Sequence, residues 1–412
     1  MTWAEIAIGD IGRVVTGDTP PRKHPEYYGD AYPFIKPTDM TVGQRLTLNY
    51  EEGYSEDGFA KYSKKIIPAG ATAVVTIGSI GQKLTWLHAD SFVNQAVNAV
   101  IPDRDKFDGL YVYYLLKHNL GLVKQADTGA SSGRENVSKS NFSALRLWAC
   151  LDLNTQKQIA EVLDALDSTI ENNQRRIALL EETARRLYLE WFVSLRFPGH
   201  ETVPVKDGVP EGWQTQTLAS VADVNARTIG SRDKPDSLLY IDISSVSTGH
   251  IASATFYSFA EAPGRARRRV VHGDIIWSCV RPNRRSYALI WEPDEKLVVS
   301  TGFAVLSATS VPFSYLYLAT TTDAFVGHLE QNATGAAYPA VTAKIFEDAE
   351  ILVPDGETLT AFDLVVLPLL EQVETLNRQN TELAQARDLL LPKLMSGQLD
   401  VSGIQLPDEV VA

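Results

Sequence analysis

Residues 154–192 read NTQKQIAEVLDALDSTIENNQRRIALLEETARRLYLEWF, and no Gly or Pro interrupts the chain from Asn154 until Pro198. Apolar residues recur here in alternating steps of four and three, which is the spacing of a heptad seam. The seam positions are Ile159, Leu163, Leu166, Ile170, Asn173, Ile177, Leu180, Ala184, Leu187 and Trp191. The stretch therefore predicts one long helix, with Asn154 and Thr155 as candidate N-caps, whose apolar stripe needs a partner.

A second helical stretch covers residues 358–395. Its seam positions are Phe362, Val366, Leu369, Val373, Leu376, Asn380, Leu383, Arg387, Leu390 and Leu394. Pro368 should kink or break this helix, because proline lacks an N–H and its ring clashes with the preceding turn. We therefore expect the main helix to start near Leu369, and to pair with the first helix in an antiparallel rod.

Each seam contains one asparagine, Asn173 in the first helix and Asn380 in the second. A buried asparagine at such a position lowers stability but fixes the register and orientation of the partner helix. The alternative is that both side chains only reach water where the seam frays.

Outside the two helices, the chain repeats itself at an offset of about 203–206 residues. The corresponding segments are residues 32–39 with 238–245, 64–70 with 268–273, and 128–130 with 334–336. Each half has short β-branched or aromatic runs and one helical stretch near its end, at residues 110–118 and 315–325. The shared order predicts two related α+β domains; the alternative is a chance similarity between two β-rich domains.

The bulk composition is that of a globular protein with two or three domains, with 412 residues, 44% hydrophobic and 22% charged. The N-terminal sequence has no signal-peptide pattern, and no apolar run is long enough to span a membrane. Two cysteines, Cys150 and Cys279, are too few for a disulfide framework and are interpreted as buried thiols. We expect a cytoplasmic protein without membrane contact.

The net charge of −13 counts against binding to nucleic acid. However, residues 354–412 carry 10 acidic and 3 basic side chains, so −7 of the total lies in the segment that holds the second helix. DNA binding requires local positive patches, not a basic total. The charge weakens a DNA-binding interpretation without excluding it.

The whole chain resembles the specificity subunit of type I restriction–modification systems. The segment Leu389–Val401, LLLPKLMSGQLDV, is similar to the family's C-terminal ending, and Leu187–Phe192 is similar to a family pattern at the end of the first helix. The resemblance implies two pseudo-repeated α/β target-recognition domains, separated by two long antiparallel coiled-coil helices. On this basis the expected domains are residues 1–153, helical spacer 154–198, domain 199–355, and spacer with tail 356–412.

The resemblance also implies a function and a set of partners. Each target-recognition domain would read one half of a split site in double-stranded DNA. The helices would dock two methylation subunits, to which restriction and motor subunits can add. The helix positions expected to form the seam and dock partners are Ile170, Asn173, Ile177, Leu180, Leu187, Leu376, Asn380, Leu383 and Leu390.

Candidate DNA contacts fall into two groups, because phosphate contacts position a protein and base contacts specify sequence. Basic clusters suited to phosphates are Lys61, Lys64, Lys65 and Lys83 in the first half, and Arg265, Arg267, Arg268, Arg269, Arg281, Arg284 and Arg285 in the second. The candidate base-reading residues, from loops 128–136 and 334–338, are Ser131, Ser132, Arg134, Asn136 and Tyr338, since Arg pairs with guanine and Asn with adenine. Either set could instead belong to ordinary solvated loops.

The sequence shows no catalytic signature. A phosphate-binding Gly-x-x-x-x-Gly-Lys-Ser/Thr loop, a dinucleotide fingerprint, the methyltransferase Asn/Asp-Pro-Pro-Tyr/Phe pattern and metal-ligand spacing of histidines are all missing. We therefore expect a non-catalytic subunit without cofactor or metal. The alternatives are a coiled-coil adaptor that binds only proteins, and a nuclease or methyltransferase with an unrecognised site.

Overall fold

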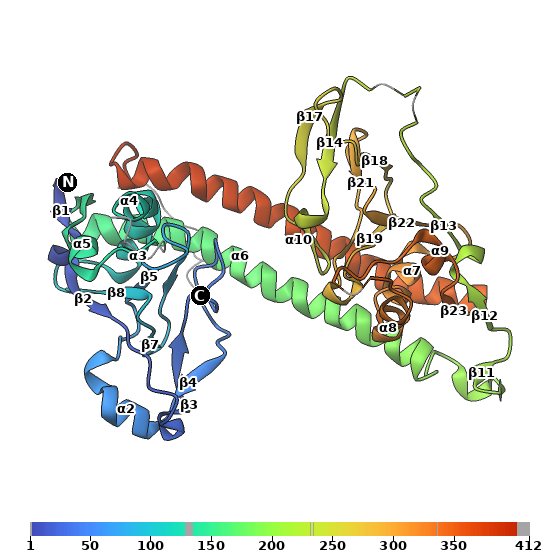
Figure 1. Ribbon diagram of the computed structural model, residues 1–412, viewed down its shortest axis with the longest axis horizontal. Helices are drawn as coiled ribbons and strands as arrows, with labels where there is room; N and C mark the ends of the chain where they lie inside the picture. Colours follow the sequence, from blue (N-terminus) through green and yellow to red (C-terminus); the bar gives the residue numbers. More distant parts are fainter. Residues whose placement is uncertain (1, 128–134, 231, 234, 336, 402–412) are drawn as a thin grey trace. The chain divides into compact units, whose positions relative to one another are not determined.

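The computed structural model describes the chain apart from residues 1, 128–134, 231, 234, 336 and 402–412 (Figure 1). It divides into two compact units, residues 1–173 with 379–412, and residues 174–378. Each unit contains one globular module and part of both long helices, α6 (Leu153–Tyr188) and α10 (Gly356–Met395). Each unit also has a hydrophobic core of its own.

The first module is built from a four-stranded sheet, a three-stranded sheet and a two-stranded ribbon. Its strands are β1 (Trp3–Ala7), β2 (Gly12–Thr16), β3 (Tyr28–Ile35), β4 (Glu52–Tyr54), β5 (Thr72–Val75), β6 (Leu84–Trp86), β7 (Phe92–Val93), β8 (Val97–Pro102) and β9 (Arg146–Cys150). Its helices and 3-10 turns are α1 (Ile8–Ile11), η1 (Pro25–Tyr27), α2 (Glu56–Tyr62), η2 (Ser63–Lys65), α3 (Gly109–His118), α4 (Leu120–Gln125) and α5 (Lys139–Ala144).

The second module contains the same kinds of element. Its strands are β10 (Val205–Lys206), β11 (Val209–Pro210), β12 (Gln214–Thr217), β13 (Ala222–Val224), β14 (Ser237–Ile241), β15 (Val246–Ser247), β16 (His250–Ile251), β17 (Thr255–Ser258), β18 (Ala266–Arg269), β19 (Ile275–Ser278), β20 (Tyr287–Leu289), β21 (Leu297–Ser300), β22 (Phe303–Ala308) and β23 (Glu350–Val353). Its helices and turns are η3 (Leu189–Val193), η4 (His200–Thr202), η5 (Leu218–Ser220), η6 (Ile243–Ser245), η7 (Pro282–Arg284), α7 (Phe313–Ala319), α8 (Asp323–Gln331) and α9 (Ala343–Glu347).

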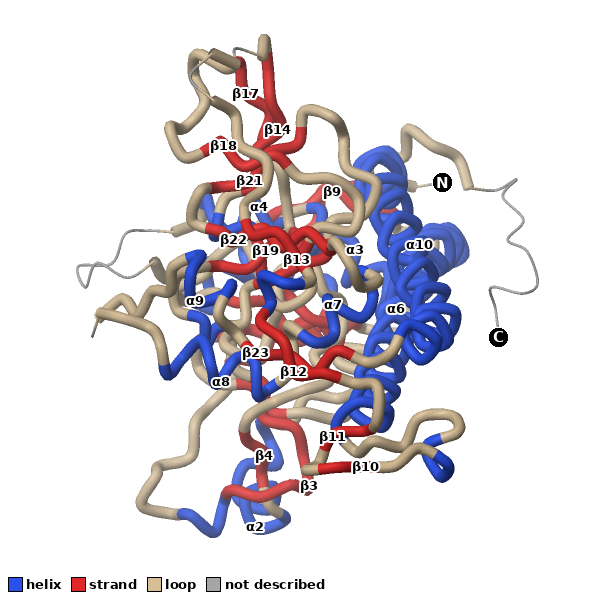
Figure 2. Tube along the Cα trace, turned by 90° about the vertical axis from the view of Figure 1, so that its right-hand side faces the viewer, coloured by secondary structure: helices blue, strands red, loops and turns tan. Residues whose placement is uncertain are grey.

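Sheet topology confirms the internal repeat. The order β2-β8-β5-β6 in the first module corresponds to β13-β22-β19-β20 in the second, where Figure 2 shows β13, β22 and β19 side by side. The sheet β4-β3-β7 corresponds to β17-β14-β21, and in both sheets the second neighbour pair is parallel. Thr72 and Ile275 hold the same register, 203 residues apart, each between the two corresponding neighbour strands. The two modules are therefore copies of one fold.

Both long helices begin at an aspartate with the same hydrogen bonds. Asp152 Oδ2 accepts from the backbone N–H and the hydroxyl of Thr155, at 2.9 and 2.7 Å. The carboxylate of Asp355 accepts from the same two groups of Thr358, at 2.9 and 2.8 Å. Such a cap stabilises a helix by about 1 kcal/mol. The prediction that Asn154 or Thr155 caps the first helix is therefore wrong, because the acceptor is Asp152.

The second helix runs without interruption through Pro368, from Gly356 to Met395, so the predicted break is wrong. The proline lies on the exposed face of the helix. The carbonyl that loses its partner belongs to Leu364, whose side chain is also exposed. Water can satisfy a carbonyl on this face, and the buried side of the helix keeps its packing.

Two other expectations need correction. The helical stretch 315–325 is two helices, α7 and α8, because Thr322 caps a new helix by accepting from Phe325 N at 3.2 Å. Of the two cysteines, Cys150 is buried as expected, but Cys279 is only half-buried.

The helices pack antiparallel within each unit. In the first unit, Ile159 and Leu163 of α6 share a core with Leu391 and Leu394 of α10. In the second unit, Phe192, at the end of α6, lies 4.7 Å from Phe362 of α10 and 5.0 Å from Tyr315 of α7, measured between ring centroids. Such aromatic pairs add about 0.5–1.5 kcal/mol each to the burial of their area, so they fasten the module to both helices.

Candidate nucleic-acid interface

The second module brings two predicted DNA-reading residues together. The guanidinium carbon of Arg281 lies 4.4 Å from the ring centroid of Tyr338, whose side chain is 68% exposed. Their backbones are joined because Arg281 N–H donates to the Pro339 carbonyl at 2.7 Å. The half-buried arginine stacked on an exposed tyrosine offers a planar cation and an aromatic face, which suit phosphates and bases.

The backbone at this site is strained. Arg281 and Arg285 both have φ of 52°, in the left-handed region that non-glycine residues rarely adopt. They flank the short turn η7, which follows β19. Arg281, Arg284 and Arg285 therefore lie together in a sharply turned loop. Such strain persists where the surrounding structure enforces it, and it is common at functional sites.

The arginines near this turn differ in whether their guanidinium groups already have partners within the chain. Arg285 is ion-paired with Asp323, at 2.5 Å between Nη2 and Oδ1, while Arg284 is exposed. Arg281 Nη2 is 3.4 Å from the Ala337 carbonyl. Arg284 and Arg281 are therefore better placed than Arg285 for a new contact.

The corresponding loop of the first module has the same backbone arrangement. Val137 N–H donates to the Thr76 carbonyl, and Val341 N–H donates to the Cys279 carbonyl, at 2.9 and 2.8 Å. The residue two places after each carbonyl has a positive φ, and it is Gly78 in the first module and Arg281 in the second. The first module thus has a glycine where the second has its stacked arginine.

The predicted base-reading loop of the first module is described only in part. Asn136 bridges to Ile77 as an isolated β-pair, and its N–H donates to Asp127 Oδ1 at 3.0 Å. Ser131, Ser132 and Arg134 lie outside the described residues.

The lysines of the first module divide into two kinds. Lys61, on α2, and Lys64, on η2, are exposed. Lys65 Nζ donates to the Thr16 carbonyl at 3.1 Å, and Lys83 Nζ donates to the Pro37 carbonyl at 2.8 Å. The last two lysines support loops, which reduces their availability for phosphates.

The corresponding arginine run of the second module also divides. Arg265 and Arg269 are exposed, whereas Arg267 packs its guanidinium 5.1 Å from the Phe259 ring centroid. Arg268 is half-buried near Cys279, and burial lowers its pKa. This run includes strand β18, whereas the lysines of the first module lie on helical turns, so the two clusters differ in structure.

The helix seam contains a polar contact at its predicted asparagines. Asn173 Nδ2 donates to Asn380 Oδ1 at 3.0 Å, within the first unit. Leu376 is buried, while the remaining predicted seam residues are half-buried: Ile170, Ile177, Leu180, Leu187, Leu383 and Leu390. The two asparagine side chains are thus hydrogen-bonded to each other, and not to water alone.

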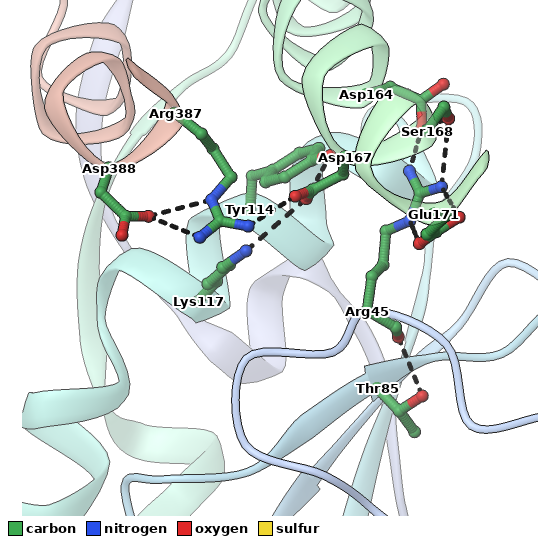
Figure 3. Close-up of polar contacts among 10 residues, drawn as sticks. All are labelled: Arg45, Thr85, Tyr114, Lys117, Asp164, Asp167, Ser168, Glu171, Arg387 and Asp388. Carbon is green, nitrogen blue, oxygen red and sulfur yellow. Dashed lines mark hydrogen bonds and ion pairs between the residues drawn. The ribbon is translucent and has the colours of Figure 1, made fainter. Parts of the chain in front are cut away.

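A charged network beside this seam was not predicted from the sequence, apart from Arg387 as a seam position (Figure 3). The buried Arg45, from the loop after β3, donates to Glu171 at 2.8 and 3.0 Å and is also bonded to Asp164 of α6. Burial alone would lower the pKa of Arg45, but its bonds to Glu171 and the nearby carboxylates hold that pKa above its ordinary value. The loop of the first module is thereby fastened to α6.

The second half of the network joins α6 to α10 and α3. Arg387 Nη1 lies 2.7 Å from Asp167 Oδ1, and Tyr114 donates its hydroxyl to Asp167 Oδ2 at 3.0 Å. Lys117 Nζ is 3.6 Å from Asp167, beyond hydrogen-bond length, and burial lowers its pKa. The charged Arg387 at a position of the apolar seam was the sequence signal for this network.

Over the residues that the structure describes, no group of three or more His, Cys, Asp or Glu side chains is arranged to hold a metal ion. In the same part of the chain, no helix combines the length and apolarity needed to cross a membrane.

Comparison with known proteins adds sequence and fold relatives. A family model described as the type I restriction modification DNA specificity domain matches residues 1–182. The type I restriction enzyme MjaIX specificity subunit of Methanocaldococcus jannaschii is 24% identical over 413 residues, covering 97% of this chain and 94% of that protein. The HindI specificity subunit of Haemophilus influenzae is 30% identical over 178 residues, covering 42% and 38%.

A solved structure shares the fold. The type I restriction–modification S subunit from M. genitalium superposes with a TM-score of 0.58 at 15% identity, covering 96% of both chains.

Proposed function

This chain belongs to the type I restriction–modification specificity subunits, a family of DNA sequence-specificity subunits, and on that premise we propose how it reads DNA. Each module contacts one half of a two-part site in double-stranded DNA. The chain itself performs no catalysis, and methylation and cleavage belong to separate subunits in the cytoplasm. The observation that carries the proposal is the duplicated module with matching loops at Gly78 and Arg281.

Within the second module, the proposed reading surface centres on Arg281 and Tyr338, with Arg284 beside them. Exposed Arg265 and Arg269 supply phosphate contacts, as do Lys61 and Lys64 in the first module. In the first module, the residues around Asn136 are proposed to read bases. Phosphate contacts of this kind are salt-dependent and position the protein, while the loop residues provide the discrimination between bases.

The domain boundaries proposed are residues 1–153 and 199–355 for the two modules, with helical spacers 154–198 and 356–412. The helices are proposed to dock two methylation subunits, to which restriction subunits add. We expect the two half-sites to lie about one DNA turn apart, ~34–36 Å between centres.

Exchange of one module tests this function directly. Residues 1–153 are replaced with the equivalent module of another specificity subunit, and the chimera is co-expressed with its methylation subunit. Sequencing of methylated genomic DNA should show one half-site changed and the other retained. An unaltered recognition sequence, or a single continuous site, would refute the two-module reading.

A protein-only adaptor is the alternative function. A mobility-shift assay of the chain with its methylation subunit, on selected against random DNA, separates the two. If the parent chain and the chimera each retain selected DNA and random DNA to the same extent, the result would favour the adaptor.

A further inference from the structure

A cavity of about 70 Å³ lies in the second unit, where the module meets both long helices. Its wall includes Glu181 of α6, Glu374 of α10, the loop residues Thr248 and Gly249, and Tyr317 of α7. One water needs only about 10–15 Å³ of such space, so the cavity has room for a group of several heavy atoms.

Two carboxylates, Glu181 and Glu374, and one arginine, Arg185, line this cavity. Among the described residues, neither Glu181 nor Glu374 forms a hydrogen bond or an ion pair. Their neighbouring arginines are engaged elsewhere, Arg185 with Glu182 at 2.7 Å and Arg378 with Glu292 at 3.3 Å. Burial raises the pKa of both Glu181 and Glu374, and this effect exceeds the lowering of the pKa by Arg185 and Arg378.

Two polar groups, from Glu181 and Tyr317, lie close to Gly249 in the wall of the cavity. A methyl group built on Gly249 would lie 3.6 Å from both Glu181 Oε1 and the Tyr317 hydroxyl oxygen. A carboxylate and a phenol therefore reach the same side of the cavity, as they would around a donor group.

The internal repeat shows what fills the corresponding place in the first unit. The helix caps Asp152 and Asp355 align the two helices at an offset of 203, so Glu374 corresponds to Glu171 and Ala184 to Arg387. The buried tyrosines Tyr111 and Tyr315 align α3 with α7 at an offset of 204, so that Thr321 corresponds to Lys117. Ala184 and Thr321 both line the cavity.

The loop beside the sheet edge gives the third correspondence. In the first unit the Arg45 carbonyl accepts from Trp86 N of β6, and in the second unit Gly249 N donates to the Tyr287 carbonyl of β20. Thr248 thus lies in the loop that takes the place of the Arg45 loop. At the offset of 203, the acids Asp164 and Asp167 correspond to Leu367 and Leu370, so the second unit keeps one of the three acids, Glu374. Small neutral side chains stand at the positions of the three cations, and Arg185 of α6 is the cation that lines this cavity.

We propose that this cavity binds a guanidinium cation, held by Glu374 and Glu181. In the first unit the equivalent Glu171 already binds a guanidinium group, that of Arg45, through two hydrogen bonds. A guanidinium has four heavy atoms and pairs bidentately with carboxylates. The aromatic side chains Tyr287, Tyr317 and Trp291, which also line the cavity, suit its planar face. The proposal does not depend on DNA reading.

The test measures thermal unfolding of the full chain with methylguanidinium chloride, and with methylammonium chloride as the salt control. Guanidinium salts ordinarily lower Tm, so a saturable rise at millimolar concentration is diagnostic of a site. Calorimetric titration should give a Kd that Glu374→Gln weakens by about tenfold or more. Glu371→Gln, an exposed change on the same helix, should leave the Kd unchanged.

Two further arms complete the experiment. Thr248→Arg supplies the missing cation, so it should raise Tm without ligand and abolish the response. Two further ligands distinguish the possible sources of the guanidinium group. N-acetyl-arginine amide carries a peptide backbone, as an arginine of a protein does, whereas agmatine represents a diffusible compound without one. A cavity that excludes the backbone therefore binds agmatine but not N-acetyl-arginine amide. No saturable effect of methylguanidinium, or equal effects of methylammonium, would overturn the proposal whether or not Thr248→Arg folds.

Discussion

Asn173 and Asn380 join the two long helices through an amide–amide hydrogen bond of 3.0 Å, at two positions of a mostly apolar seam. Asn173 is 4% exposed, so its partner matters for stability. Removing one asparagine leaves the other buried without its bond, which costs about 1–3 kcal/mol.

We predict that Asn173→Ala lowers the free energy of unfolding by about 1–3 kcal/mol. The double variant Asn173→Leu with Asn380→Leu should be neutral or more stable, because both polar groups are removed together. Urea unfolding measures both. A double variant less stable than the single one would show that the pair stabilises the helices rather than specifying their register.

The charged network of the first unit predicts a larger effect. Arg387 and Asp167 are both buried, and breaking such a pair from one side costs about 3–5 kcal/mol. We expect Arg387→Met to fall at the lower end of that range, because Lys117 remains 3.6 Å from Asp167. The double variant Arg387→Met with Asp167→Leu should recover only part of the loss in urea unfolding, because Lys117 and the Tyr114 hydroxyl lose their acidic partner. No recovery would mean that Asp167 is stabilised chiefly by Tyr114.

Periodicity in the sequence predicted the two helices, their seams and the repeated modules, because these depend on patterns that span many residues. It did not predict the caps, although Asp152 and Asp355 each stand three residues before a threonine. The break at Pro368 was a local rule overridden by the packing of Phe362, Val366 and Leu370 on the buried side of the helix.

The candidate site was harder to predict for a physical reason. The Arg281–Tyr338 pair depends on a left-handed backbone and on residues 57 positions apart, neither of which a basic cluster reveals. Lys65 and Lys83 looked equivalent to Lys64 in the sequence, yet backbone carbonyls take their ammonium groups. Charge in a sequence indicates a patch, whereas hydrogen bonding decides which members of it are free.

The proposed docking of methylation subunits can be tested separately from the folding of the helices. Leu179 of α6 and Leu389 of α10 are 68% and 67% exposed, while Leu180 is half-buried in the seam. We expect Leu179→Glu or Leu389→Glu to reduce binding of the methylation subunit, since removing exposed apolar area changes the free energy of unfolding by less than about 0.5 kcal/mol. Leu180→Glu should instead lower Tm. Sizing by light scattering measures the complex, and an intact complex with both surface variants would exclude Leu179 and Leu389 as docking positions.

The strained backbone at Arg281 allows its effect on stability to be separated from its proposed role in DNA binding. Arg281→Gly and Arg281→Ala both remove the guanidinium that stacks on Tyr338, but only glycine adopts φ of 52° without strain. We therefore expect the glycine variant to be more stable than the alanine variant by about 1 kcal/mol, the reverse of their usual order. Both should weaken specific DNA binding equally, by about 1–3 kcal/mol, whereas Lys206→Ala, an exposed change on β10, should not. Fluorescence anisotropy at several salt concentrations measures the affinity, and unchanged binding in both variants would remove Arg281 from the interface.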